Sequence, residues 1–239
     1  MKKIKHILVC GLAVVASAVA VQAQTLTQDW KMTTGLPSAA EGRAGVGFEG
    51  KVYTNFKANK SIVSFDGSKT ETLLAGKSGS GVGISRDSKG NLIIVNGWAA
   101  AGSMKSFVLY NVATKESKTV NVTLPDGVTA ARMDFIGRAA GDVFSEEGAA
   151  LFIIGSGQSV AAKIFIAKGE YVAAKSKALP KLPFTVDNMT IIQPLTESPE
   201  SDDVAVRYRS NIDFYHYDGS KWVAYKRVGT VGTGGGGGG

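Results

Sequence analysis

Short segments in which polar and apolar residues alternate recur along the chain, and this period of two predicts half-buried β-strands. Two sets of three such strands are the clearest, at 51–56, 61–65 and 70–75 and again at 203–209, 212–217 and 222–228. After the first residues, no segment keeps the i, i+3, i+4, i+7 apolar spacing of a helix beyond about two turns. The pattern therefore predicts an all-β protein.

The first and last sets of strands share a turn. The hexapeptides SFDGSK (64–69) and HYDGSK (216–221) both contain DGSK between two strands of a predicted hairpin. Asp-Gly is favoured in such turns because tight hairpins need residues with φ > 0, and we expect both Asp66 and Gly67 to supply it. The repeated residues are therefore predicted to serve the turn rather than a binding site.

Two weaker copies of the same unit lie between these sets. Their predicted strands are 90–97, 106–112 and 117–124, followed by 149–157, 162–167 and 171–176. A plausible inner strand precedes each of the four units, at 43–50, 81–90, 132–139 and 188–195. The hairpin turns recur at roughly 50-residue intervals, which is typical of propeller blades. We predict a β-propeller-like array of about four blades of antiparallel strands.

The two ends of the chain have compositions unlike the rest. Lys2, Lys3 and Lys5 precede a short apolar run, and small residues at Val21 and Ala23 complete the pattern of a secretory signal peptide over 1–23. The alternatives are a membrane anchor, for which the run is short, and lipidation of Cys10, which lies early in the run. The predicted propeller then spans 24–231, and 232–239 is a glycine-rich flexible tail. Four blades are the low end for closing a ring, so an incomplete ring stays open as an alternative.

Composition limits the chemistry. Removal of 1–23 takes away Cys10, the single cysteine, and leaves His216 as the single histidine, so no disulfide, thiol nucleophile or Cys/His zinc site is expected. No cofactor is predicted. The formal charge of +7 includes three lysines of the signal, and the remaining Lys and Arg residues are scattered, so we expect no nucleic-acid partner and no membrane span after cleavage.

Catalytic signals are weak. His216 has no G-x-S-x-G elbow to accompany it. Asp134 and Asp187 are the acids nearest to predicted inner strands, and they carry the alternative of a glycoside hydrolase or lyase. The acidic stretch ESPESDD (197–203) lacks the spacing of a calcium loop and is predicted to be a solvated charge cluster.

Binding is the better-supported class. Trp98 lies in a loop of small residues, NGWAAAGSM, where packing does not require a large ring. Arg207, Tyr208 and Arg209 alternate along a predicted strand and could present charge to an anionic ligand. These four residues are the candidate ligand-binding residues.

Four stretches carry a resemblance: DWKMTTGLP, GRAGVGFEGKVYTNF, IVSFDG and GVGISRDSKGNLIIVN. Together they resemble uncharacterised secreted bacterial β-propeller proteins, clearly over residues 28–125 and more thinly afterwards. The resemblance implies a propeller fold and a secreted or periplasmic location, but it brings no catalytic residues. The expected function is that of an exported, non-catalytic binding protein of the bacterial envelope that recognises a carbohydrate, peptide or protein through one face. A structural or assembly scaffold is the third alternative.

Overall fold

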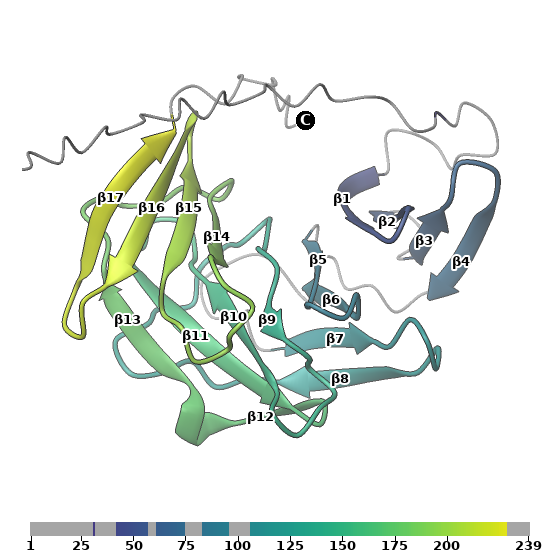
Figure 1. Cartoon of the computed structure of the whole chain (residues 1–239), viewed down its shortest axis with the longest axis horizontal. Helices are drawn as coiled ribbons and strands as arrows, with labels where there is room; N and C mark the ends of the chain where they lie inside the picture. Colours follow the sequence, from purple (N-terminus) through teal and green to yellow (C-terminus); the bar gives the residue numbers. More distant parts are fainter. Residues whose placement is uncertain (1–30, 32–41, 57–60, 75–82, 96–105, 229–239) are drawn as a thin grey trace, which may run out of the picture. The chain divides into compact units, whose positions relative to one another are not determined.

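The computed structural model describes residue 31 and the ranges 42–56, 61–74, 83–95 and 106–228. Within these ranges, four antiparallel sheets follow one another in chain order and form the blades of a four-bladed β-propeller (Figure 1). All of the strands belong to one compact unit of the chain. The predicted all-β propeller of about four blades is confirmed.

Each blade is an up-and-down meander, and in the third an additional strand, β13, pairs with β11. The first blade contains β1 (Gly42–Phe48), β2 (Lys51–Phe56), β3 (Ser61–Phe65) and β4 (Thr70–Leu74). The second contains β5 (Ile84–Arg86), β6 (Leu92–Val95), β7 (Ser106–Tyr110) and β8 (Ser117–Asn121). The third contains β9 (Ala140–Gly141), β10 (Ala149–Ile153), β11 (Val160–Ala167), β12 (Glu170–Tyr171) and β13 (Lys177–Lys181). The fourth contains β14 (Ile191–Pro194), β15 (Val204–Tyr208), β16 (Asn211–Tyr217) and β17 (Trp222–Val228).

The third blade departs from the prediction in two places. The predicted strand 171–176 is instead split into the short β12, the 3-10 helix η2 (Ala173–Lys175) and the start of the connection to β13. The predicted inner strand 132–139 is irregular, because its backbone bonds to neighbouring loops rather than to a ladder: Ser156 N–H donates to the carbonyl of Arg132 at 2.7 Å. Gly137 lets this segment approach β14 closely, since a Cβ there would lie 2.2 Å from the carbonyl oxygen of Ile192.

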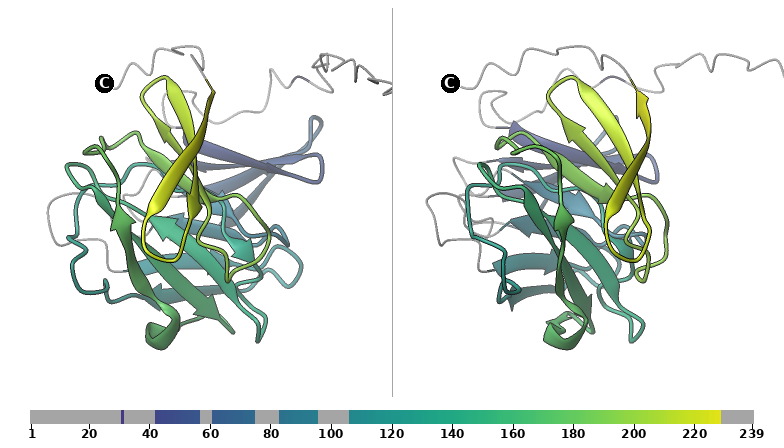
Figure 2. Two further views of the ribbon diagram at one scale, coloured as in Figure 1. Left: turned by 60° about the vertical axis from the view of Figure 1, so that its left-hand side comes forward. Right: turned by 90° about the vertical axis from the view of Figure 1, so that its left-hand side faces the viewer.

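Apolar cores fill the spaces between consecutive blades. The strands β6 and β10 are buried along their whole length, so alternate side chains of each enter different cores. Leu92 and Ile94 pack toward the first blade, whereas Ile93 and Val95 pack toward the third. Phe152 of β10 belongs to the core shared with the fourth blade, whose sheet packs face to face on β10 and β11 (Figure 2).

The repeated DGSK turn has the same hydrogen bonds in both copies. The carboxylate of Asp66 accepts from the Ser68 N–H at 3.0 Å, the Ser68 hydroxyl at 2.9 Å and the Lys69 N–H at 2.7 Å. Asp218 accepts from the equivalent groups at 2.8–2.9 Å. These bonds lower the pKa of Asp66 to about 2. Only the glycine of each copy has φ > 0, so the expectation that the aspartate shares this role is wrong; its side chain closes the turn instead.

A buried carboxylate joins the second and third blades. Asp87, at 0 % exposure, accepts hydrogen bonds from the N–H groups of Lys89 and Asn91, the Asn91 amide and the Val143 N–H, all at 2.8–3.0 Å. Burial raises the pKa of Asp87, and these hydrogen bonds oppose the rise. The four donors satisfy the carboxylate within the protein, so its role in this structure is to hold the turn 87–91 against the third blade.

A second buried carboxylate joins the third and fourth blades. Asp202 forms ion pairs with Lys163, at 2.8 Å, and with Lys177, and its backbone carbonyl accepts from the Trp222 indole at 2.9 Å. The side chains of Asp202 and Lys163 are 6 % and 4 % exposed. The expectation that 197–203 is a solvated charge cluster is therefore wrong for Asp202, because two lysines of the neighbouring blade reach it.

Candidate binding face

A surface at the junction of the third and fourth blades gathers side chains that the fold does not bury. We call it the Phe184 face; it comprises residues 181–185, the hairpin tip Tyr208–Arg209 and residues 224–227 of β17. In segment 181–185, Leu182 is buried and its N–H donates to the Ser159 carbonyl at 2.8 Å. Val186 is buried and its N–H donates to the Gln158 carbonyl at 2.9 Å. These two anchors hold the ends of the segment, so the residues between them, Pro183 to Thr185, lie at the surface.

Three side chains stack on one another in this face. The ring of Phe184 lies on the ring of Tyr208 with centroids 4.5 Å apart and an interplanar angle of 16°. The guanidinium carbon of Arg209 lies over the Tyr208 ring, 5.0 Å from its centroid. Tyr208 therefore contacts both an aromatic ring and a cation, and the contact with its ring orders the side chain of the exposed Arg209.

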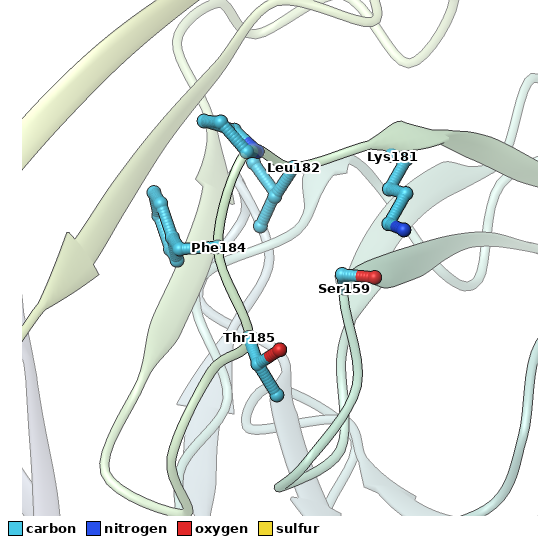
Figure 3. Close-up of a pocket in the computed structure, with 6 residues that line it drawn as sticks. Ser159, Lys181, Leu182, Phe184 and Thr185 are labelled. Atoms are coloured by element: carbon cyan, nitrogen blue, oxygen red, sulfur yellow. The ribbon is translucent and has the colours of Figure 1, made fainter.

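The first of two pockets opens beside Phe184 and has a volume of about 490 Å³. It is lined by Ser159, Lys181, Leu182, Pro183, Phe184 and Thr185. Figure 3 shows the Lys181 ammonium and the hydroxyls of Ser159 and Thr185 on one side of the pocket, and the Phe184 ring directed away from them. This pocket thus combines a cation and hydroxyl groups with an apolar wall.

The second pocket, of about 370 Å³, adjoins the first through Pro183 and Phe184. Its other lining residues belong to the fourth blade: Asp213, Tyr215, Ala224, Tyr225, Lys226 and Arg227. A β-bulge shapes this wall, because Tyr215 pairs with Ala224 and Phe214 with Lys226, which leaves Tyr225 as the additional residue. Tyr225 is 59 % exposed, the largest value among the exposed large hydrophobic side chains of the described chain.

Positive charge predominates in this face. Asp213 is the one acid that lines either pocket, and Arg227 neutralises it with two hydrogen bonds of 2.6 and 2.9 Å. Lys181, Lys226 and Arg209 have no acidic partner among the described residues. Burial, and after it the charge of Asp213, raises the pKa of Tyr215 against the opposing charge of Arg227, so this phenol stays protonated at neutral pH.

The structure separates the predicted binding residues. Tyr208 and Arg209 lie in the Phe184 face, but Arg207 lies on the opposite side of β15, as alternation requires, and donates to the Met189 carbonyl at 3.0 Å. Trp98 lies outside the described residues. Sequence reasoning did not single out Phe184, Lys181 or Tyr225, although LPFT between two strands, with its proline and aromatic ring, was an available signal.

The candidate catalytic residues are engaged in other interactions. The carboxylate of Asp134 is 8 % exposed and is bound by Arg132 at 2.7 Å and by the Asn188 amide at 2.5 Å. Asp187 accepts from the Met189 N–H and the Thr190 hydroxyl, both at 3.0 Å. His216 is exposed on β16 and contacts Asp203 at 3.0 Å. Arg132 and Asn188 therefore hold the Asp134 carboxylate, whereas Asp187 accepts hydrogen bonds within its own turn.

The described ranges show neither a metal-binding cluster nor a membrane-spanning helix. Within them, His, Cys, Asp and Glu side chains do not gather in groups of three or more that could hold a metal ion. The same part of the chain has no helix with the length and apolar character needed to cross a bilayer.

Comparison with known proteins gives distant structural likenesses. No protein-family model and no curated protein sequence matches this chain. Among solved structures, YCF48 bound to a D1 peptide is similar over 82 % of this chain and 55 % of its own, with 14 % identity and a TM-score of 0.46. A luciferin-regenerating enzyme is similar over 79 % of this chain and 62 % of its own, with 14 % identity and a TM-score of 0.44. The chain thus spans less than two thirds of the length of these structures, and its own strand pairing defines the propeller.

Proposed function

We propose that this chain is a non-catalytic binding protein that holds a polypeptide partner in the Phe184 face. The observation that carries the proposal is the pair of adjoining pockets that share Phe184 and are bordered by the exposed ring of Tyr225. Exposed aromatic rings beside surface concavities are typical of protein interfaces, where they supply most of the binding free energy. Elsewhere in the described chain, large aromatic side chains are at least partly buried.

The arrangement of the rings favours a polypeptide over a carbohydrate. Sugars bind by stacking on an open aromatic face, but the ring of Tyr208 is already stacked on Phe184 and lies under the guanidinium of Arg209. The two pockets form a surface divided by Phe184, which suits side chains of an extended segment that enter on either side of the ring. A sugar-binding protein remains the second candidate, through Tyr225 alone.

The test is a selection of peptides from a random display library on the full chain, followed by calorimetric titration of the enriched peptides. We expect Tyr225→Ala to weaken binding about tenfold, because an exposed interface aromatic contributes about 1.4 kcal/mol or more. Val223→Ala is the matched control: Val223 is 42 % exposed on the same strand but lines neither pocket. Equal losses in both variants would place the ligand elsewhere on β17.

The alternative functions predict different results when the full chain is tested with peptides and polysaccharides. If no peptide is enriched but a polysaccharide raises the melting temperature of the full chain, the carbohydrate alternative replaces this proposal. If a polysaccharide is cleaved, and Asp134→Asn abolishes cleavage, the chain is a glycoside hydrolase or lyase. If neither peptides nor glycans bind, the scaffold alternative is favoured.

We further propose that the protein is exported to the envelope or its surroundings. The basic residues, short apolar run and small residues of 1–23 support this, and these residues lie outside the described ranges. Mass spectrometry of the protein produced in a bacterial host is expected to show a mature chain that begins at Gln24. An intact N-terminus in the cytosolic fraction would overturn the proposal.

A further inference from the structure

We infer that the partner presents carboxylates to the Phe184 face, so that the ligand is an acidic polypeptide segment. The inference rests on the proposed polypeptide-binding function and names the chemistry of its partner. It is carried by three cations around Phe184: Lys181 in the first pocket, Lys226 in the second, and Arg209 joined to Phe184 through Tyr208.

Arg209 is the group best prepared to bind a carboxylate. A guanidinium that lies on an aromatic ring keeps its N–H edge free, and that edge matches the two oxygens of a carboxylate. Stacking on Tyr208 removes part of the rotamer freedom that Arg209 would otherwise lose on binding. Its backbone also has φ +53°, a conformation that an arginine seldom adopts, at the turn between β15 and β16.

Lys181 provides a second anion site of different geometry. Its ammonium shares the first pocket with the hydroxyls of Ser159 and Thr185, all of which can donate hydrogen bonds (Figure 3). No carboxylate lines this pocket to compete for them. An acidic side chain that enters here would replace water around Lys181 and accept hydrogen bonds from its ammonium and from the two hydroxyls.

The second pocket offers a single available cation. Arg227 is held by Asp213 through two hydrogen bonds, so its charge is already matched. Lys226 is exposed and pairs with no described acid, and it lies next to Tyr225 in the bulge. The partner is therefore expected to place one acidic group on either side of an apolar contact with Phe184 and Pro183.

The same features disfavour a nucleic acid. Single-stranded nucleic acids bind proteins through open rings on which bases stack, but the Tyr208 ring is already in contact with Phe184 and with the Arg209 guanidinium. The three cations are separate and flank an aromatic ring and a proline rather than form a continuous basic stripe. Spaced carboxylates around an apolar side chain fit this arrangement better.

Fluorescence anisotropy with the full chain tests the inference. The probe is a labelled decapeptide with alternating Glu and Gly around a central Phe, and its Gln counterpart is the comparison. We expect the Glu peptide to bind at least about tenfold more tightly in 50 mM salt and to weaken as salt is raised. Arg209→Gln should weaken the Glu peptide about tenfold, and Arg209→Lys, which keeps the charge but loses the planar fork, about threefold.

Lys89→Gln is the matched control, since it removes one exposed charge from the turn 87–91, which contributes to neither pocket. Equal effects of Lys89→Gln and Arg209→Gln would show non-specific attraction and overturn the inference. Suppose instead that a single-stranded oligonucleotide binds as tightly as the Glu peptide to the natural chain and fails to bind to Arg209→Gln. That result would assign the site to nucleic acid instead.

The two proposals fail in different ways. Suppose that the selected peptides carry no net charge, bind less tightly to Tyr225→Ala and bind equally well to Arg209→Gln. The polypeptide-binding function then stands, and the inference of an acidic partner is wrong. If no display peptide and no Glu peptide binds, both are wrong.

Discussion

The turn around Asp87 and the Phe184 face are both rich in polar groups, and they differ in whether those groups have partners. Asp87 is fully buried and accepts four hydrogen bonds from the second and third blades. In the Phe184 face, Lys181, Arg209 and Lys226 are exposed and pair with no described acid. A matched polar group contributes to stability, whereas an unmatched one at the surface is available to a ligand. The first region therefore serves the fold, and the second is the surface on which the proposed binding function rests.

Buried charge alone does not distinguish the two regions. Asp202, like Asp87, is buried, and its lysine partners come from the neighbouring blade. Burial would raise the pKa of Asp202, but the hydrogen bonds and charges of Lys163 and Lys177 outweigh it and hold that pKa below its ordinary value. Its ion pairs with Lys163 and Lys177 join the third and fourth blades, and its own carboxylate is buried.

The largest effect should come from Asp87→Ala. Removing this carboxylate leaves several buried N–H groups without an acceptor, so we expect the free energy of unfolding to fall by about 4 kcal/mol. Chemical denaturation of the full chain measures it. The control is Asp66→Ala, which removes an exposed aspartate from a turn of local hydrogen bonds and should cost far less. Comparable losses would contradict the assignment of Asp87 to the inter-blade junction.

A somewhat smaller loss is expected from Asp202→Asn. The variant keeps a hydrogen-bond acceptor for Lys163 but leaves that buried ammonium without an opposite charge, which should cost about 3 kcal/mol. The melting temperature and the urea midpoint should both fall. If Asp202→Asn is as stable as the natural chain, the ion pair does not hold the third and fourth blades together.

Acidic pH should remove the same interaction. Because the pKa of Asp202 is lower in the folded chain than in the unfolded chain, its contribution to stability is present above about pH 4 and is lost as the pH falls through the folded-state pKa. Unfolding measured at several pH values between 5 and 2 should therefore show a steeper loss for the natural chain than for Asp202→Asn. Parallel curves would mean that other carboxylates govern the acid transition.

The smallest effect on stability should come from the Phe184 face. Tyr225→Ala and Lys226→Gln change exposed side chains of an edge strand, so we expect the free energy of unfolding to change by less than about 0.5 kcal/mol. Denaturation of each variant, beside its peptide affinity, sharpens the comparison between the two regions. A loss of stability as large as that of Asp202→Asn would show that these residues serve the fold.

Local chemistry was enough to predict the blades. The strands 51–56, 61–65 and 222–228 are observed with the predicted limits, because alternation and the DGSK turn are properties of neighbouring residues. The prediction was weakest for 132–139 and 171–176. There the backbone either forms hydrogen bonds with distant segments or forms a 3-10 helix. The alternation of neighbouring residues does not predict hydrogen bonds to distant segments.

The candidate site was predicted only in part. The sequence by itself indicated a binding protein of propeller type and pointed to Arg207, Tyr208 and Arg209, because charged and aromatic residues alternate there. The tertiary structure decided which of them share a surface: Arg207 turns to the Met189 carbonyl, and Phe184, 24 residues before Tyr208, stacks on its ring. Strand alternation sets the side of a sheet on which a residue lies, but the packing of loops from two blades sets what it meets there, and that depends on contacts between residues far apart in the chain.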